Sequence, residues 1–248
     1  MLRALYTSGT AMMVQNKRMN VITNNITNVG TVGYKSDELL SRSFRDMMIT
    51  RINDPYVERS AVGPHNTGIH IDLINTTFEQ GPLSATPRET DLAIVGDGFF
   101  TVETPDGPRY TRAGNFNKDA DGLVCTPEGY PLLGENGPIV VPGEEMTVDE
   151  MGNVFSDGAF VDRVRVGSFE DNQILRKGGE NLYYTYDGSE PGPSNAQVKQ
   201  KMLEGSNVDV TDETVRMIEV SRAFETNQRI VRMLDETLQK AVNEIARL

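Results

Sequence analysis

Apolar positions near the C-terminus recur every seven residues. The two interleaved series are Met217, Phe224, Val231, Leu238, Ile245 and Val220, Asn227, Leu234, Ala241, Leu248. Steps of three and four residues that repeat in this way are the a/d pattern of a coiled-coil helix. The pattern predicts a long helix from Asp209 onward that packs along a partner helix, with one polar seam position at Asn227.

The N-terminal segment carries a thinner apolar stripe. It consists of Leu5, Met12, Met19 and Ile26, flanked by Leu2, Ile22 and Val29. Ser8 and Gln15 occupy positions where a tight seam would need leucine. Because isolated helices depend on tertiary packing, we expect this segment to pair with the C-terminal helix. The longer helix then has a surplus of apolar positions, which we expect to contact identical neighbours in an assembly.

Helix breakers are confined to the middle of the chain. All 12 prolines lie between Pro55 and Pro193, and 20 of the 23 glycines lie between Gly63 and Gly205. Short β-branched or aromatic runs such as L-A-I-V (92–95) and F-F-T-V-E-T (99–104) alternate there with D-G and E-G pairs. This alternation predicts about ten short antiparallel strands between residues 75 and 200.

The sequence thus predicts an α+β fold: long N- and C-terminal α-helices paired as a coiled coil, with a central mainly antiparallel β domain. The expected divisions are an N-terminal helix and turn (1–35), an extended or irregular connecting segment (36–75), a β-rich domain (76–203) and the C-terminal helix (204–248). A short helix or strand is expected at 43–52.

Charge and composition argue against several kinds of partner and site. The formal net charge of −12 argues against nucleic acid and against anionic membrane surfaces as partners. No apolar run approaches the ~20 residues of a membrane span, and the early apolar run Ala11–Val14 is shorter than the core of a secretory signal. The single cysteine, Cys125, excludes an internal disulfide and is expected to be a small buried hydrophobe.

Candidate chemistry is sparse. Asn117, Asp119, Asp121 and Glu128 are spaced as in a calcium loop, but Pro127 interrupts them and their flanks are typical of strands. We therefore favour a hairpin turn, with calcium binding as the alternative.

The two histidines, His65 and His70, are expected in an exposed loop, and no nucleophile or phosphate-loop motif occurs. We expect neither an enzyme nor a cofactor or metal site.

Three blocks of the sequence point to a family. They are V-I-T-N-N-I-T-N-V-G-T-V-G-Y-K (21–35), D-L-A-I-V-G-D-G-F-F (91–100) and S-N-V-D-V-T-D-E-T-V-R-M-I-E-V-S-R-A-F-E-T-N (206–227). In this order they resemble the bacterial flagellar hook–basal-body rod proteins, of the distal or proximal rod type. The chain departs from the family pattern at Thr23 and Thr27, where alanine is usual, which makes the end of the first helix uncertain.

The resemblance implies a structural subunit of the flagellar rod that polymerises into a helical tube and transmits torque from motor to hook. It implies copies of the chain, other rod and hook proteins and the flagellar type III export apparatus as partners. The expected location is the basal body, in the periplasm or cell-wall zone, after export without a cleaved signal peptide. The alternative is a β-rich extracellular binding module that its terminal helices oligomerise.

Two sets of residues are expected to carry this function. The assembly interface would consist of Leu5, Met12, Met19, Ile22, Ile26, Met217, Phe224, Val231, Leu234, Leu238 and Ile245. The exit from the first helix would be shaped by Asn24, Asn25, Asn28, Gly33 and Tyr34, because asparagine and glycine tolerate left-handed backbone and cap exposed carbonyls.

Overall fold

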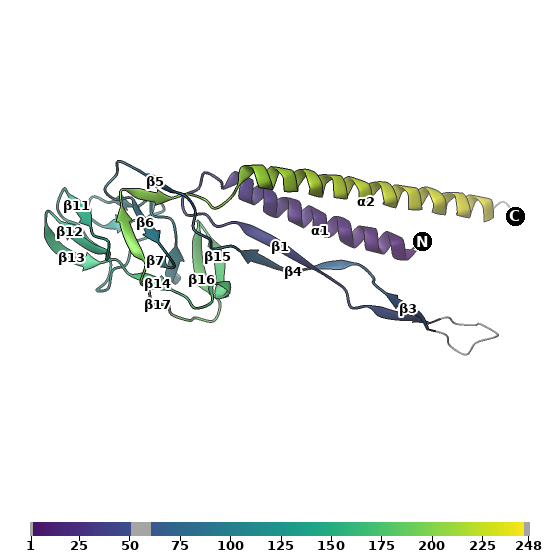
Figure 1. The fold of residues 1–248 in the computed structure, drawn as a ribbon, viewed down its shortest axis with the longest axis horizontal. Coiled ribbons are helices and arrows are strands. Elements are labelled where there is room, and N and C mark those ends of the chain that lie inside the picture. The colour runs from purple at the N-terminus through teal and green to yellow at the C-terminus, as the bar shows by residue number, and fades with distance from the viewer. Residues whose placement is uncertain (1, 51–60, 246–248) are drawn as a thin grey trace. The chain divides into compact units, whose positions relative to one another are not determined.

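The computed structural model describes residues 2–50 and 61–245. It has helices at both ends of the chain and a central antiparallel β region, which confirms the predicted α+β class (Figure 1). The chain divides into two compact units. The first, here called the helix unit, contains residues 1–26, 37–75 and 210–248; the second, the β unit, contains residues 27–36 and 76–209.

Two antiparallel helices dominate the helix unit (Figure 1). Helix α1 spans Leu2–Thr27 and helix α2 spans Val210–Ile245. Asp212 and Glu213 lie in the first turn of α2, where the positive end of the helix dipole favours negative side chains. Neither described helix is long and apolar enough to cross a membrane.

The segment expected to be extended or irregular forms two antiparallel strand pairs. Strand β1 (Asp37–Ser43) pairs with β4 (Ile69–Thr76), and β2 (Met47–Thr50) pairs with β3 (Ala61–His65). Part of the 43–52 segment is therefore a strand, and residues 51 and 52 lie outside the described residues. Helix α1 lies between α2 and the β1–β4 ribbon (Figure 1).

The β unit contains fifteen named strands, β5 to β19, all of them within the described range 61–245. Their bounds are β5 Leu83–Ala85, β6 Leu92–Val95, β7 Phe99–Thr104, β8 Gly107–Thr111, β9 Asn117–Lys118, β10 Val124–Cys125, β11 Met146–Val148, β12 Asn153–Ser156, β13 Ala159–Arg163, β14 Val166–Ser168, β15 Leu175–Gly179, β16 Leu182–Thr185, β17 Gly192–Pro193, β18 Gln197–Gln200 and β19 Met202–Glu204, with a 3₁₀ turn at Asn172–Ile174. The expectation of about ten strands was too low, because several strands have only two or three residues.

One sheet organises the β unit. Six strands in the order β15-β16-β8-β7-β14-β17 form it, while β11-β12-β13 form a second sheet and β5, β6, β9 and β10 each pair with one other strand. Every registered pair is antiparallel.

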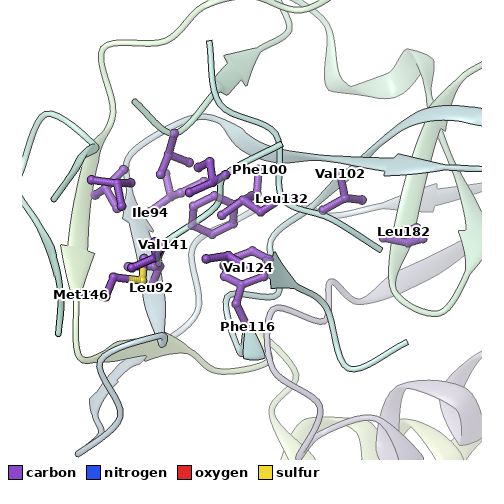
Figure 2. Close-up of a cluster of buried hydrophobic side chains, with 14 residues drawn as sticks. Leu92, Ile94, Phe100, Val102, Phe116, Val124, Leu132, Val141, Met146 and Leu182 are labelled. Atoms are coloured by element: carbon purple, nitrogen blue, oxygen red, sulfur yellow. The ribbon is translucent and has the colours of Figure 1, made fainter. Parts of the chain in front are cut away.

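The core of the β unit lies on both faces of β7. Successive side chains of a strand point to opposite faces, so Phe99 and Phe100 enter different clusters. Phe100 lies in the larger cluster with Leu132 and meets Phe116 edge-to-face at 5.2 Å between ring centroids (Figure 2). Phe99 packs with aromatic rings of the smaller cluster. Each fully buried large side chain contributes about 1.5–3 kcal/mol, so the β unit has a closed core of its own.

Candidate assembly interface

On α1, the predicted stripe is most exposed at its first residue and most buried at Ile22. Leu5 is 38% exposed, Met12, Met19 and Ile26 are half-buried, and Ile22 is 4% exposed. The stripe is therefore better covered near the C-terminal end of the helix than near its beginning.

On α2, the predicted stripe is the protected face of the helix. Five members of the set are half-buried: Met217, Phe224, Val231, Leu234 and Leu238. Val220, in the second heptad series, is buried, and Ile245 ends the helix, where its side chain lies outside the described residues. None of the five is fully covered within the described part of the chain. The helix also exposes apolar side chains outside the stripe, among them Val215 and Ile218.

An open apolar groove lies where helix α1, strand β4 and helix α2 meet. Gly9, Met12 and Met13 from α1 line it together with Phe224 from α2 and Ile71 from β4, and its volume is about 530 Å³. A tightly interdigitated coiled-coil seam would leave no such space, because knobs fill the facing holes. The helices thus present an apolar groove that neither of them fills.

A second buried face of α1 escaped the sequence analysis. Val14 and Val21 pack against Leu39 of β1, with Ile69 of β4 beside them. The two valines are seven residues apart, as the residues of the first stripe are, so a search for a second heptad series on α1 would have found them. Helix α1 therefore has apolar contacts on two sides.

Asn25 links three elements of the helix unit. Its side-chain amide accepts from the backbone N–H of Asp37 at 3.0 Å and donates to the carbonyl oxygen of the same residue at 2.9 Å. It also donates to Glu213 Oε1 of α2 at 3.4 Å. Because Asn25 is only 1% exposed, these bonds fix the end of α1 to β1 and to the start of α2.

Of the other residues of the helix exit, Asn24 lies in the helix unit and the remaining three lie in the β unit. Asn24 is exposed near the end of α1, and Asn28 accepts from the backbone and the hydroxyl of Thr31. Gly33 adopts a φ of +66°, a conformation that favours glycine, and a side chain there would overlap the backbone of Arg112. Tyr34 is buried, and the ammonium group of Lys177 lies 4.2 Å from the centre of its ring.

A buried charged cluster follows the helix exit. Lys35 and Glu204 are fully buried and pair at 2.6 Å, and Arg112 contacts the other oxygen of the same carboxylate at 3.3 Å. Lys35 also donates to the carbonyl of Glu79, and the backbone N–H of Gly81 donates to Glu204.

Burial lowers the pKa of Lys35, while the hydrogen bond and charge of Glu204 oppose that shift. The cluster ties the segment after α1 and the strand before α2 to the central strands, all within the β unit.

Asn207 makes a second connection of this kind. Its side chain accepts from the backbone N–H of Ser36 at 2.8 Å and donates to the carbonyl of Thr77 at 2.8 Å. Sequence reasoning named neither this residue nor the charged cluster, although Lys35, Glu204 and Asn207 lie in or near the segments that carry the family resemblance. The chain segments that lead out of α1 and into α2 are therefore joined side by side.

The remaining candidate residues lie in strands and short turns. The Asn117–Glu128 stretch holds the β9–β10 pair, in which Cys125 lies opposite Asn117, so the favoured hairpin is confirmed. His65 lies in β3 and His70 in β4, so the expectation of an exposed loop was wrong for both, and each is half-buried.

Cys125 is half-buried rather than buried, because it lies in the two-residue strand β10 of this small hairpin. Burial raises the pKa of its thiol, and Asp119 acts in the same direction.

Comparisons with known proteins cover the same segments. Three family models match: a flagella basal body rod protein model at residues 5–35, a flagellar hook protein FlgE/F/G D1 domain at 93–156, and a flagellar basal body rod FlgEFG protein C-terminal model at 199–244.

Relatives that match nearly the whole chain come from the same group of flagellar proteins. The flagellar hook-basal body complex protein FlhO of Bacillus subtilis (strain 168) is 34% identical over 100% of both chains. The flagellar basal-body rod protein FlgG of the same organism is 35% identical, over 98% of this chain and 99% of its own. The flagellar basal-body rod protein FlgF of Caulobacter vibrioides is 31% identical, over 99% and 97%.

Proposed function

We propose, because this chain belongs to the flagellar basal-body rod protein family, that it is a rod subunit whose terminal helices complete their pairing as a coiled coil only when the chain polymerises. Polymerisation would complete the burial of the interface residues that were predicted from the sequence. Each half-covered stripe would then bury its remaining apolar surface against helices of neighbouring copies.

One observation carries this proposal: the apolar groove between α1 and α2. Its walls of Met12, Met13 and Phe224 are shared between the helices but are filled by neither of them. Apolar surface removed from water stabilises an interface by about 25 cal/mol per Å². A neighbouring helix that packs into the groove would bury this apolar surface and stabilise the assembly. A single chain leaves the surface in contact with water.

The β unit supports the mechanical side of the proposal. Its side chains pack in closed clusters, and the buried Lys35–Glu204–Arg112 cluster holds the segments next to both helices. A subunit with such a body can pass force between its neighbours without local unfolding. Heterologous contacts that do not close would build an open helical tube, which would transmit torque from motor to hook.

We further propose the partners and the location that follow from this role. Rod and hook proteins would meet the ends of the assembly, and the flagellar type III apparatus would export the chain without a cleaved signal. The rod segment would lie in the basal body, in the periplasm or the cell-wall zone. Helices that are only half-covered alone suit a chain that must travel unfolded.

Leu238→Asp tests the proposal. Leu238 is a half-buried stripe residue far from the β unit in sequence, so an aspartate there would place a charge in the subunit interface. We expect loss of motility and loss of the chain from isolated basal bodies, with the cooperative urea unfolding of the β unit unchanged.

The matched control is Gln239→Asp, which adds the same side chain one residue away, at an exposed position. This variant should swim and assemble. Normal swimming of the Leu238→Asp strain would contradict the proposed interface.

A further inference from the structure

A second, smaller cavity lies between the helices and the ribbon of the helix unit. Its volume is about 270 Å³, and residues of α1, β1 and α2 line it. The apolar part of the lining is buried: Val21, Ile22, Leu39 and Val220. We call this cavity the acidic socket, because Asp37, Glu38, Glu213 and Glu219 also line it.

Glu213 brings an incompletely bonded carboxylate to the socket. Its Oε1 accepts from Asn25 at 3.4 Å and lies 3.6 Å from a nitrogen of Arg216. Its Oε2 is buried and has no hydrogen-bond partner among residues 2–50 and 61–245. The side chain is only 9% exposed, so water does not readily replace a missing donor. A buried acceptor without a partner is costly, which favours a ligand that donates to it.

The charges of the socket indicate which donor fits. Four acidic side chains face two basic ones, Arg18 and Arg216, and Arg18 also donates to the hydroxyl of Ser41. The resulting charge of −2 favours a cation. The apolar walls suit the methylene stem of a lysine or arginine, whose charged end would reach Glu213 Oε2.

We propose that the acidic socket receives an arginine side chain from α2 of a second copy of this chain. This inference rests on the proposed function, because it needs copies packed helix against helix. Residues 36–209 hold 29 of the 36 acidic and 14 of the 24 basic residues, a net charge of −15. Outside the socket, helix α2 exposes three arginines, Arg222, Arg229 and Arg232, whereas helix α1 exposes one, Arg3. A neighbouring α2 is therefore the best source of the cation.

Site-specific photo-crosslinking tests the inference in assembled rods. A benzophenone amino acid replaces Glu219 at the rim of the socket, or Glu225 on the same helix as the control, in a strain without its own copy of the gene. Isolated basal bodies are irradiated, and crosslinked chains are separated by mass and mapped by peptide sequencing. We expect a two-chain product from position 219 that contains an α2 peptide with one of the three arginines, and a different product or none from position 225.

A conservative variant tests the carboxylate itself. Glu213→Gln keeps the hydrogen bond from Asn25 but removes the charge, so we expect isolated rods to release this subunit about tenfold faster at moderate salt. Glu225→Gln, on an exposed position of the same helix, should not change the release rate.

Different results would contradict the proposed rod function and the proposed arginine contact in the acidic socket. Absence of the unmodified chain from basal bodies would overturn the proposed function. If the chain is present but position 219 yields only one-chain products, or products without an α2 arginine peptide, the socket inference alone is wrong. Equal release of the Glu213→Gln and wild-type subunits would also overturn it.

Discussion

The β unit and the helix unit differ in how completely they cover their apolar side chains. In the β unit, Leu92, Ile94 and Phe100 are fully removed from solvent. In the helix unit, stripe residues such as Met12 and Phe224 are half-buried, and Leu5 is more than one-third exposed. The β unit therefore closes its core within one chain, whereas the helix unit leaves part of its apolar surface uncovered.

The polar contacts show the same difference. Glu204 in the β unit has cationic or backbone donors on both carboxylate oxygens, from Lys35, Gly81 and Arg112. Among the residues that the structure describes, Glu213 in the helix unit has donors on one oxygen only. The proposed function needs both kinds of region, because an exported subunit would require a body that is stable on its own and helices that become stable on assembly.

The largest expected effect compares two phenylalanines. Phe100→Ala would leave a cavity in the closed core and should lower the free energy of unfolding by about 3–5 kcal/mol. Phe224→Ala removes a half-buried ring and should lower the free energy of unfolding of the dilute chain by about 1 kcal/mol. Urea unfolding followed by tyrosine fluorescence measures both. Equal losses would mean that the helix unit is as complete as the β unit in a single chain.

The buried charged cluster gives the next effect. Glu204→Gln would leave Lys35 and Arg112 buried without a negative partner, so the β unit should lose about 3 kcal/mol in the same unfolding measurement. The control is Glu135→Gln, which breaks the exposed ion pair with Arg163 and should cost at most ~1 kcal/mol. A loss below ~1 kcal/mol for Glu204→Gln would show that the cluster does not hold the β unit together.

Substitutions of two nearby glycines should have smaller effects on stability, and these effects should differ from each other. Gly33→Ala would strain a left-handed residue and overlap the Arg112 backbone, so we expect a loss of about 2 kcal/mol. Gly30 has open space around its Cβ position and no positive φ, so Gly30→Ala should be neutral or slightly stabilising, by up to ~1 kcal/mol. Thermal unfolding of both variants separates the cases. Similar losses would refute the specific role of Gly33.

Periodic features of this chain could be predicted from the sequence, since helix and strand patterns are local. The seven-residue series on α2 identified its protected face, and the runs at 92–95 and 99–104 are strands β6 and β7. The number of strands was underestimated because pairs as short as β9–β10 have no period to detect. Asn25 was predicted to shape the helix exit, but no local pattern indicates its hydrogen bond to Glu213.

Contacts between distant segments could not be predicted. Lys35 and Glu204 are 169 positions apart, and their charges look like two solvated residues among 60 charged ones. Only the antiparallel β topology, which brings β19 next to the helix exit, makes them partners. The unbonded oxygen of Glu213 is invisible for the same reason, because an unmet hydrogen bond depends on the whole surrounding packing.

The smallest expected effect concerns the pH dependence of the helix unit. Burial raises the pKa of Glu213, aided by the charges of Asp212 and Glu38 and opposed by Arg216 and by the hydrogen bond from Asn25. The folded chain then holds this proton more tightly than the unfolded chain does. The resulting contribution to stability is present at acidic pH and is lost as pH rises through the raised pKa.

The stability of the wild type relative to Glu213→Gln should therefore decrease between pH 4 and pH 7 in the dilute chain. Helix unfolding followed by circular dichroism measures this difference, and the other carboxylates cancel between the two proteins. In assembled rods the sign should reverse, because an arginine in the acidic socket stabilises the charged carboxylate and lowers its pKa. The same falling trend in rods and in the dilute chain would mean that no cation from a neighbour reaches Glu213, and that this part of the helix unit stays as incomplete in the assembly as it is alone.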